Sequence, residues 1–252
     1  MDVEHKVAVV TGGARRGGKA IALALARSGA RVIITFNTSA AEAAITVGEI
    51  ERAGGQAAAV PCDQRDPGAI DRLFDRLRQD VDRLDILVNS AAIMERKPAL
   101  EITLDDWSRV VDTNLRGPFF LAQRAAQWML AAGGGVIVNI ADLSALHPWP
   151  SYLTHTISKS GLVAMTQAWA LALAPSIRVN AIAPGMVLKP EGWSDERWAK
   201  MIAALPLQRG GTAQDVAEAV LYCVRSDFMT GQTIVIDGGR SLKARDHRKA
   251  GG

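Results

Sequence analysis

Three side chains in the second half of the chain are of types that carry proton-transfer chemistry in proteins. Asp142 precedes His155 along the sequence, and Lys159 follows His155 by four residues, which is about one helical turn. A nearby ammonium disfavours the imidazolium form of a histidine, whereas a nearby carboxylate favours it. The spacing leaves open which neighbour dominates. If Asp142 is ionised and close, an Asp–His pair could deliver protons near neutral pH.

A glycine-rich turn near the amino terminus could bind a phosphate. The apolar run 7–10 leads into Gly12, Gly17 and Gly18, and small and apolar residues continue at helical spacing through Leu25. A strand, a glycine turn and a helix in this order let backbone N–H groups approach a phosphate at the positive end of the helix. The pattern G-x-G-x-x-G is not matched, so an ordinary tight strand–helix turn is the alternative for this stretch alone.

Short apolar runs alternate with helical patterns along the whole chain. Strands are predicted at 7–10, 31–36, 57–60, 86–88, 136–140, 177–182 and 233–236. Helices are predicted between them, through 25 and at 39–53, 66–81, 104–132, 156–174 and 215–226. Pro118 is expected to kink or divide the helical region 104–132. The alternation predicts an α/β fold in which a parallel sheet is covered by helices on both faces.

Ligands of such sheets bind at the carboxyl ends of the strands. Small or polar residues gather at the predicted ends: the turn Gly12–Gly18, Asn37, Thr38, Asp63, Asn89, Asp142, Pro184 and Gly185. Each of them alone is explained as a turn residue, but their joint placement favours a nucleotide site.

The residues after the second predicted strand indicate which nicotinamide cofactor is used. Enzymes that use NAD usually carry an acidic residue there, whereas this chain has Phe36, Asn37 and Thr38. Arg15 in the glycine turn would lie close to the 2′-phosphate of NADP, and a guanidinium binds phosphate through a fork of donors. The sequence therefore predicts NADP(H) rather than NAD(H). The alternative is that Arg15 and Arg16 are solvated turn residues.

Composition and charge exclude several other classes of protein. The 252 residues are 48% hydrophobic, with a mean hydropathy of +0.08 and a net charge of +3. The basic segment 243–252 alone carries that charge, so no nucleic-acid surface is expected, and the segment is predicted to be a disordered tail. Cys62 and Cys223 form neither a disulfide framework nor a metal pattern and fit a reducing cytoplasm. No signal-peptide pattern or membrane-spanning run is found, so a cytoplasmic location is expected.

Over essentially its whole length, the chain resembles the short-chain dehydrogenase/reductase family. The matching residues are Thr11-Gly12 with Gly18, Asp63, Asn89-Ser90-Ala91-Ala92, Asn114, Ser158-Lys159, Pro184-Gly185 and Ile236-Asp237-Gly238-Gly239. The resemblance implies a single-domain Rossmann fold over 1–242 with a doubly wound, seven-stranded parallel sheet. It also implies a homotetramer that acts on a small-molecule substrate without a metal, a cofactor site that includes Ala91, and a role for Asn114 in a proton relay.

Three departures from the family pattern concern the active site. Arg16 replaces a glycine of the turn, Asp142 replaces the catalytic serine, and His155 replaces the catalytic tyrosine. The first two are similar to pteridine reductases, as is Tyr152, which matches a substrate-pocket tyrosine. The resemblance then implies that Arg16 contacts substrate and cofactor phosphate, that Asp142 is the acid partner, and that Lys159 binds the nicotinamide ribose.

His155 has no counterpart in that pattern, and three interpretations stay open. It is a working acid in a modified site, or a loss that leaves a weak or inactive cofactor-binding protein, or an isolated substitution in an otherwise ordinary enzyme. Tyr152 could partly stand in for the missing tyrosine, although a pocket wall is its simpler role.

On the substrate side, the segment 186–208 is expected to close over the substrate. Trp193 and Trp198 with Met201 are predicted to form the apolar side of a short helix, and Trp149 could stack on a flat ring. The sequence does not distinguish a pterin, a ketone or a sugar as the substrate.

Overall fold

The computed structural model of the protein describes residues 1–190 and 192–242, and the predicted tail 243–252 lies outside them. Within the described residues, parallel strands form one seven-stranded sheet in the order β3-β2-β1-β4-β5-β6-β7. The strands are β1 (Val7–Val10), β2 (Arg31–Phe36), β3 (Gln56–Pro61), β4 (Ile86–Asn89), β5 (Gly135–Ile140), β6 (Ile177–Pro184) and β7 (Thr233–Ile236). The predicted α/β class, strand number and parallel arrangement are confirmed.

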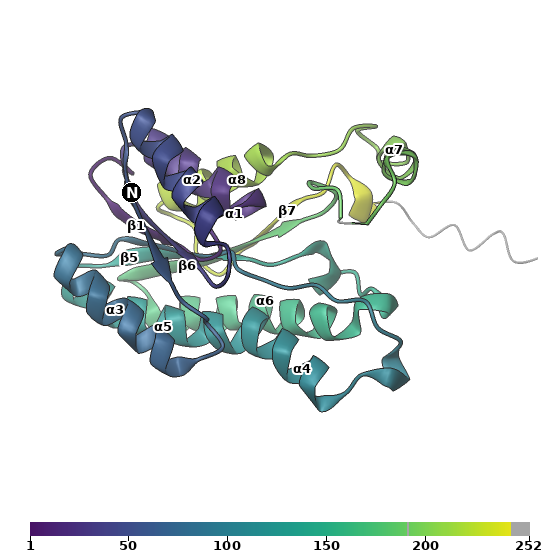
Figure 1. Ribbon diagram of the computed structural model, residues 1–252, viewed down its shortest axis with the longest axis horizontal. Coiled ribbons are helices and arrows are strands. Elements are labelled where there is room, and N and C mark those ends of the chain that lie inside the picture. Colours follow the sequence, from purple (N-terminus) through teal and green to yellow (C-terminus); the bar gives the residue numbers. More distant parts are fainter. Residues whose placement is uncertain (191, 243–252) are drawn as a thin grey trace, which may run out of the picture.

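Helices cover both faces of the sheet, as Figure 1 shows. They are α1 (Arg16–Arg27), α2 (Ala40–Arg52), α3 (Pro67–Asp80), α4 (Leu104–Val111), α5 (Gly117–Ala131), α6 (Leu153–Leu173), α7 (Asp195–Ala203) and α8 (Ala213–Arg225). Successive side chains of a strand point to opposite faces. Val10 therefore packs with residues of α1, α2 and α8, and Val9 with residues of α3, α5 and α6. Burial on both faces explains why the strands are unbroken apolar runs.

The strand order reverses at β1, which pairs with β2 on one side and with β4 on the other. Val10 is opposite Ile34 in one register and opposite Val88 in the other, so the segments that follow these strands start at nearly the same level. Such a reversal opens a crevice at the carboxyl ends of the strands. None of the helices in the described part is long and apolar enough to cross a bilayer.

Two predicted helix boundaries differ from the structure. Helix α6 begins at Leu153 rather than at 156, because a 3₁₀ turn at Pro150–Tyr152 leads directly into it. His155 therefore lies inside the first turn of α6. The predicted helical region 104–132 is divided, but by a π-helical turn at Asp112–Arg116 that precedes Pro118. Pro118 lies in the first turn of α5, where its missing N–H is tolerated.

The third difference concerns the segment expected to cover the substrate. Helix α7 begins only at Asp195, because the Ser194 side chain caps it by accepting a hydrogen bond from the Arg197 amide. Trp193 therefore precedes the helix, and the prediction that it shares a helical face with Trp198 is wrong. The two rings still meet edge to face, with centroids 6.4 Å apart. In Figure 1, α7 stands apart from the helical layers at one end of the molecule.

Candidate active site

A cavity of about 530 Å³ lies at the carboxyl ends of β1 to β4. Ten of the thirteen residues predicted to bind the cofactor line it: Gly12, Arg15, Arg16, Gly17, Gly18, Asn37, Thr38, Asp63, Ala91 and Pro184. They come from segments far apart in the sequence that the sheet brings to one edge. The volume is typical of small-molecule sites.

The glycine turn is held tightly against its neighbours. Gly12 has a φ of +63°, and a side chain there would place its Cβ 2.9 Å from the Ala91 Cα. A Cβ on Gly18 would lie 2.2 Å from the carbonyl oxygen of Gly12. The Thr11 hydroxyl accepts hydrogen bonds from the Ser90 and Ala91 amides and so ties the end of β1 to the end of β4. These contacts fix the loop that faces the cavity at the start of α1.

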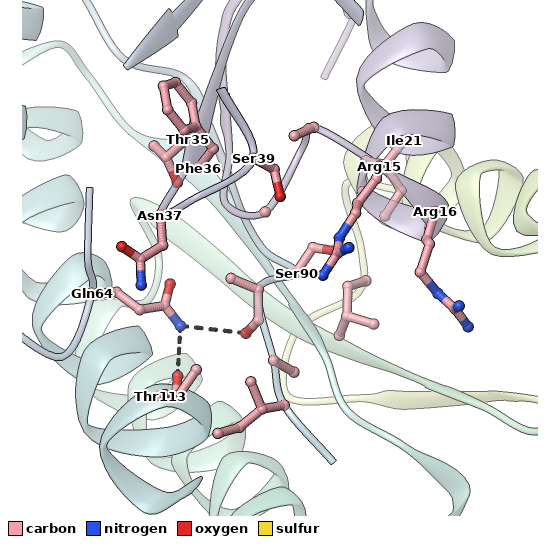
Figure 2. Close-up of a pocket in the computed structure, with 18 of the residues that line it drawn as sticks. Arg15, Arg16, Ile21, Thr35, Phe36, Asn37, Ser39, Gln64, Ser90 and Thr113 are labelled. Atoms are coloured by element: carbon pink, nitrogen blue, oxygen red, sulfur yellow. Dashed lines mark hydrogen bonds between the residues drawn. The ribbon is translucent and has the colours of Figure 1, made fainter. Parts of the chain in front are cut away.

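The two arginines of the turn point in different directions, as Figure 2 shows. The Arg15 side chain extends into the cavity, and no carboxylate among the described residues forms an ion pair with it. The Arg16 guanidinium points away from that of Arg15, at another side of the cavity, and donates to the Lys189 carbonyl at 3.3 Å. Arg16 also has a φ of +54°, a conformation that favours glycine. Arg15 is therefore the better placed of the two to meet an anion in the cavity.

Several residues that line the cavity were not predicted from the sequence. Ser39 precedes α2, and its side chain does not cap that helix. The Gln64 amide donates to the carbonyls of Ala91 and Thr113 (Figure 2). The Arg65 Nη2 lies 2.6 Å from the Asp63 Oδ2, and the hydrogen bonds from this guanidinium lower the pKa of the Asp63 carboxyl. Ser39 directly follows Thr38, and Gln64 directly follows Asp63, both of which were predicted to bind the cofactor. This position after a strand end was the signal that could have found them.

Three predicted cofactor-binding residues do not line this cavity. The Asn89 side chain is buried and donates to the Asn139 side chain at 2.9 Å, which ties β4 to β5. The Gly185 amide donates to the Ile236 carbonyl and so joins the ends of β6 and β7. Lys159 is buried one helical turn after His155. For Asn89, the structure shows this sheet contact, and the cofactor contact stays a prediction.

The predicted catalytic residues come together around the first turn of α6. His155 is 4% exposed, and its Nε2 lies 3.9 Å from the Asp142 Oδ1. Its Nδ1 lies 3.1 Å from the Ile93 carbonyl oxygen. Because a carbonyl only accepts, this contact assigns a hydrogen to Nδ1. The Nε2 atom is then the one that faces Asp142.

Asn114 supports this assignment. Its side-chain nitrogen donates to the Ile93 carbonyl at 2.9 Å and to the Ser158 hydroxyl at 3.0 Å, which uses both of its hydrogens. It therefore has no hydrogen left for the His155 Nδ1, which lies 3.4 Å away. The π-helical turn places Asn114 here, and its amide oxygen accepts from the Ile93 amide. Asn114 thus fixes the carbonyl that orients the histidine.

For each of the two charged neighbours of His155, Asp142 and Lys159, burial shifts the pKa in one direction and nearby groups shift it in the other. Burial opposes the ionisation of Asp142, but His155 and the Ser144 amide, which donates at 2.7 Å, outweigh it and lower the pKa of the Asp142 carboxyl. Burial lowers the pKa of Lys159 to about 8, partly opposed by Asp142. The Lys159 ammonium donates to the Ile140 carbonyl at 2.6 Å. The cluster therefore holds an ionised carboxylate next to the imidazole.

The predicted substrate-binding aromatics lie outside the cavity described above. Trp149 and Tyr152 lie just before α6, with ring centroids 6.2 Å apart. Trp193 lies near α7, with the Arg197 guanidinium 3.9 Å from its ring centre. Trp149 and Tyr152 are thus next to the turn that carries His155, whereas Trp193 belongs to a separate segment.

Comparisons with known proteins agree with this architecture. A family model described as enoyl-(acyl carrier protein) reductase matches residues 13–241. A curated relative, the 3beta-hydroxysteroid dehydrogenase 1 of Eggerthella lenta, is 35% identical over 249 residues, which cover 96% of this chain and 95% of the relative.

Two solved structures are similar over nearly the whole chain. A putative short-chain alcohol dehydrogenase from Sinorhizobium meliloti 1021 has a TM-score of 0.91 at 35% identity, covering 96% of this chain and 99% of that one. A putative NAD(P) dependent gluconate 5-dehydrogenase from Beutenbergia cavernae, with NADP bound at low occupancy, has a TM-score of 0.89 at 32% identity, covering 96% and 100%. Both the sequence motifs and the full-length matches thus lead to one assignment: the chain belongs to the short-chain dehydrogenase/reductase family.

Proposed function

We propose that this protein is an NADP(H)-dependent oxidoreductase that transfers a hydride between the nicotinamide and a small carbonyl or pterin-like substrate, with His155 in place of the usual tyrosine. The observation that carries the proposal is the orientation of His155, whose Nε2 faces Asp142 at 3.9 Å. The substrate of the Eggerthella relative is a hydroxysteroid and that of the Beutenbergia structure is named as gluconate. Both contain alcohol groups that a hydride acceptor could oxidise.

The donor set of the cavity fits NADP(H). Arg15 extends into it, Ser39 and Thr38 bring hydroxyl groups to its wall, and no acidic residue follows β2 directly. A guanidinium with hydroxyl donors suits a 2′-phosphate, whereas a carboxylate would repel it. The similar structure from Beutenbergia cavernae contains NADP, which supports this choice. When bound, the cofactor supplies a hydride from C4 of the nicotinamide.

His155 and its neighbours supply the proton. With Nδ1–H donating to the Ile93 carbonyl, a proton on Nε2 would be attracted by the Asp142 carboxylate. As the substrate carbonyl carbon accepts the hydride, the oxygen takes this proton from Nε2 and the ring becomes neutral. Lys159 would bind the ribose hydroxyls from its place beside Ile140. Asn114 holds the Ile93 carbonyl, and with it the ring, in position.

A catalytically weak cofactor-binding protein is the second candidate, because the Nε2 atom is buried and has no hydrogen-bond partner among the described residues. NADPH oxidation should be followed with a panel of pterins, quinones and ketones, for the wild type and for His155→Tyr. Turnover by the wild type supports the proposal. Tight NADPH binding without turnover, together with activity in the tyrosine variant, would establish the second candidate instead.

The family resemblance also implies a homotetramer, and we propose that assembly here. Analytical ultracentrifugation tests it, since four chains of 26.9 kDa sediment very differently from one.

A further inference from the structure

Arg240 lies on the face of Trp149, with its guanidinium carbon 5.0 Å from the ring centre. The two residues are far apart in the sequence, because Arg240 follows β7 and Trp149 precedes α6. Arg240 is only partly exposed. A half-buried guanidinium on an aromatic ring is fixed in orientation by the ring quadrupole. The N–H groups of the Arg240 guanidinium that do not contact the ring are then free to donate hydrogen bonds to another group.

No acidic residue of the described chain pairs with this guanidinium. Asp237 lies three residues before Arg240 in the chain, and its carboxylate oxygens accept from the Gly239 amide at 2.8 Å and from the Ser241 amide at 2.7 Å. Asp237 therefore shapes the turn that carries Arg240. Partly buried cations are normally paired, so an arginine with five donors and no acidic partner indicates a ligand that carries negative charge.

Trp149 places Arg240 on the substrate side of the site. The Trp149 amide and carbonyl both contact the hydroxyl of Thr156, at 3.3 and 3.4 Å, and Thr156 directly follows His155. The Trp149 ring also packs against Tyr152, one turn before His155. Trp149 is thus held by the helical turn that carries His155, and Arg240 is held by Trp149. Both residues lie outside the cavity that fits the cofactor.

We propose that Arg240, held against Trp149, binds a carboxylate or similar anionic group of the substrate, so that the protein acts on acidic carbonyl compounds or their alcohols. The inference rests on the proposed function for the reaction, and it adds the substrate class. A guanidinium binds a carboxylate through two parallel hydrogen bonds and remains charged at every relevant pH. Such a contact would orient the carbonyl end of the molecule relative to His155.

The test compares acids with their esters. Straight-chain oxo acids with different spacings between ketone and carboxylate, levulinate among them, are each paired with their methyl ester and measured for kcat/KM with NADPH. For the best-placed acid, we expect a preference of about ten- to a hundredfold over its ester, which is the usual range for a charge-assisted contact. The variant Arg240→Gln should remove this preference and leave the ester unchanged. Equal losses for acid and ester would indicate a structural role and overturn the proposal.

Arg78→Gln is the matched control, because the Arg78 guanidinium of α3 lies 5.5 Å from the ring centre of Trp128 in α5 and belongs to no part of the proposed site. It should leave the acid preference intact. Calorimetry of the same acids and esters with the NADP⁺ complex separates the two proposals. If the acids bind tighter than the esters only with Arg240 present, but nothing is reduced, the proposed function fails and the anion site stands. If acids and esters bind the wild type equally, the anion site is wrong.

Discussion

The Nε2 atom of His155 faces the Oδ1 of Asp142 across 3.9 Å, while the opposite ring nitrogen is fixed on the Ile93 carbonyl. Two acceptor atoms would face each other here if Nε2 carried no hydrogen. A proton on Nε2 converts this contact into attraction between opposite charges. If Asp142 and His155 replace the serine and tyrosine of the family, as we propose, the carboxylate and the ring form a matched pair.

The first prediction follows from this pair. Asp142→Asn keeps an oxygen that can accept from the Ser144 amide but removes the charge that stabilises the imidazolium. We expect kcat for carbonyl reduction to fall about ten- to a hundredfold and the alkaline limb of its pH profile to move to lower pH, because proton donation is impaired. NADPH affinity should stay unchanged. Profiles that superimpose for the two proteins would show that Asp142 does not support His155.

Cofactor choice gives the second prediction. Arg15→Gln removes the guanidinium that extends into the cavity (Figure 2). The Kd for NADPH should rise about tenfold or more and the Kd for NADH should hardly change, because only NADPH carries the 2′-phosphate. Arg52→Gln, an exposed arginine at the end of α2, is the control and should bind both cofactors normally. A parallel loss of both affinities would contradict the role given to Arg15.

The glycine turn gives the third prediction, with its control in the neighbouring residue. Gly18→Ala would place a Cβ 2.2 Å from the Gly12 carbonyl oxygen, so the backbone of the turn must move. We expect it to lower the free energy of unfolding by about 2 kcal/mol or more, in the range of overpacking. Gly17→Ala meets no atom within 4 Å and should leave the stability of the cofactor-free protein nearly unchanged. Equal thermal stability of the two variants would show that the turn is not tightly packed.

The gathering of the predicted cofactor-binding residues around one cavity could be predicted from the sequence because it depends on strand ends. Arg15, Asn37, Asp63 and Ala91 each follow a short apolar run, and parallel strands bring such positions to one edge. Asn89 also lies at a strand end, but it is the last residue of β4 itself rather than a residue after the strand. Its side chain points to Asn139. A shift of one residue along a strand reverses the face to which a side chain points, which the sequence pattern did not resolve.

Long-range side-chain contacts could not be predicted. The sequence could not show that the Ile93 carbonyl, 62 residues from His155, would fix the orientation of the ring. The Arg240–Trp149 contact joins the end of β7 to the start of α6, and no local pattern marks it. Trp193 was placed on a helix by its spacing, whereas the Ser194 cap starts that helix two residues later.

The last prediction concerns the effect of the buried Lys159 on the free energy of unfolding. Burial lowers its pKa from 10.5 to about 8, so below pH 8 the folded protein carries a buried charge that the unfolded chain solvates. Between pH 8 and 10.5 the unfolded state binds the extra proton, and stability therefore rises with pH through this window. Lys159→Met should be more stable than the wild type at pH 7 by up to about 3 kcal/mol, at 1.36 kcal/mol for each unit of pKa, although the variant loses turnover.

Urea unfolding of both cofactor-free proteins from pH 7 to 10.5 checks this, and the quantity to follow is the difference between them. Burial raises the pKa values of Cys62 and Cys223 to about 11, which makes either protein less stable as pH rises above 9. This effect cancels in the difference, which should shrink towards zero as pH rises through 8 to 10.5. A difference that stays constant with pH would mean that Lys159 keeps an ordinary pKa in the fold, and that its buried ammonium is compensated by the Ile140 carbonyl and Asp142.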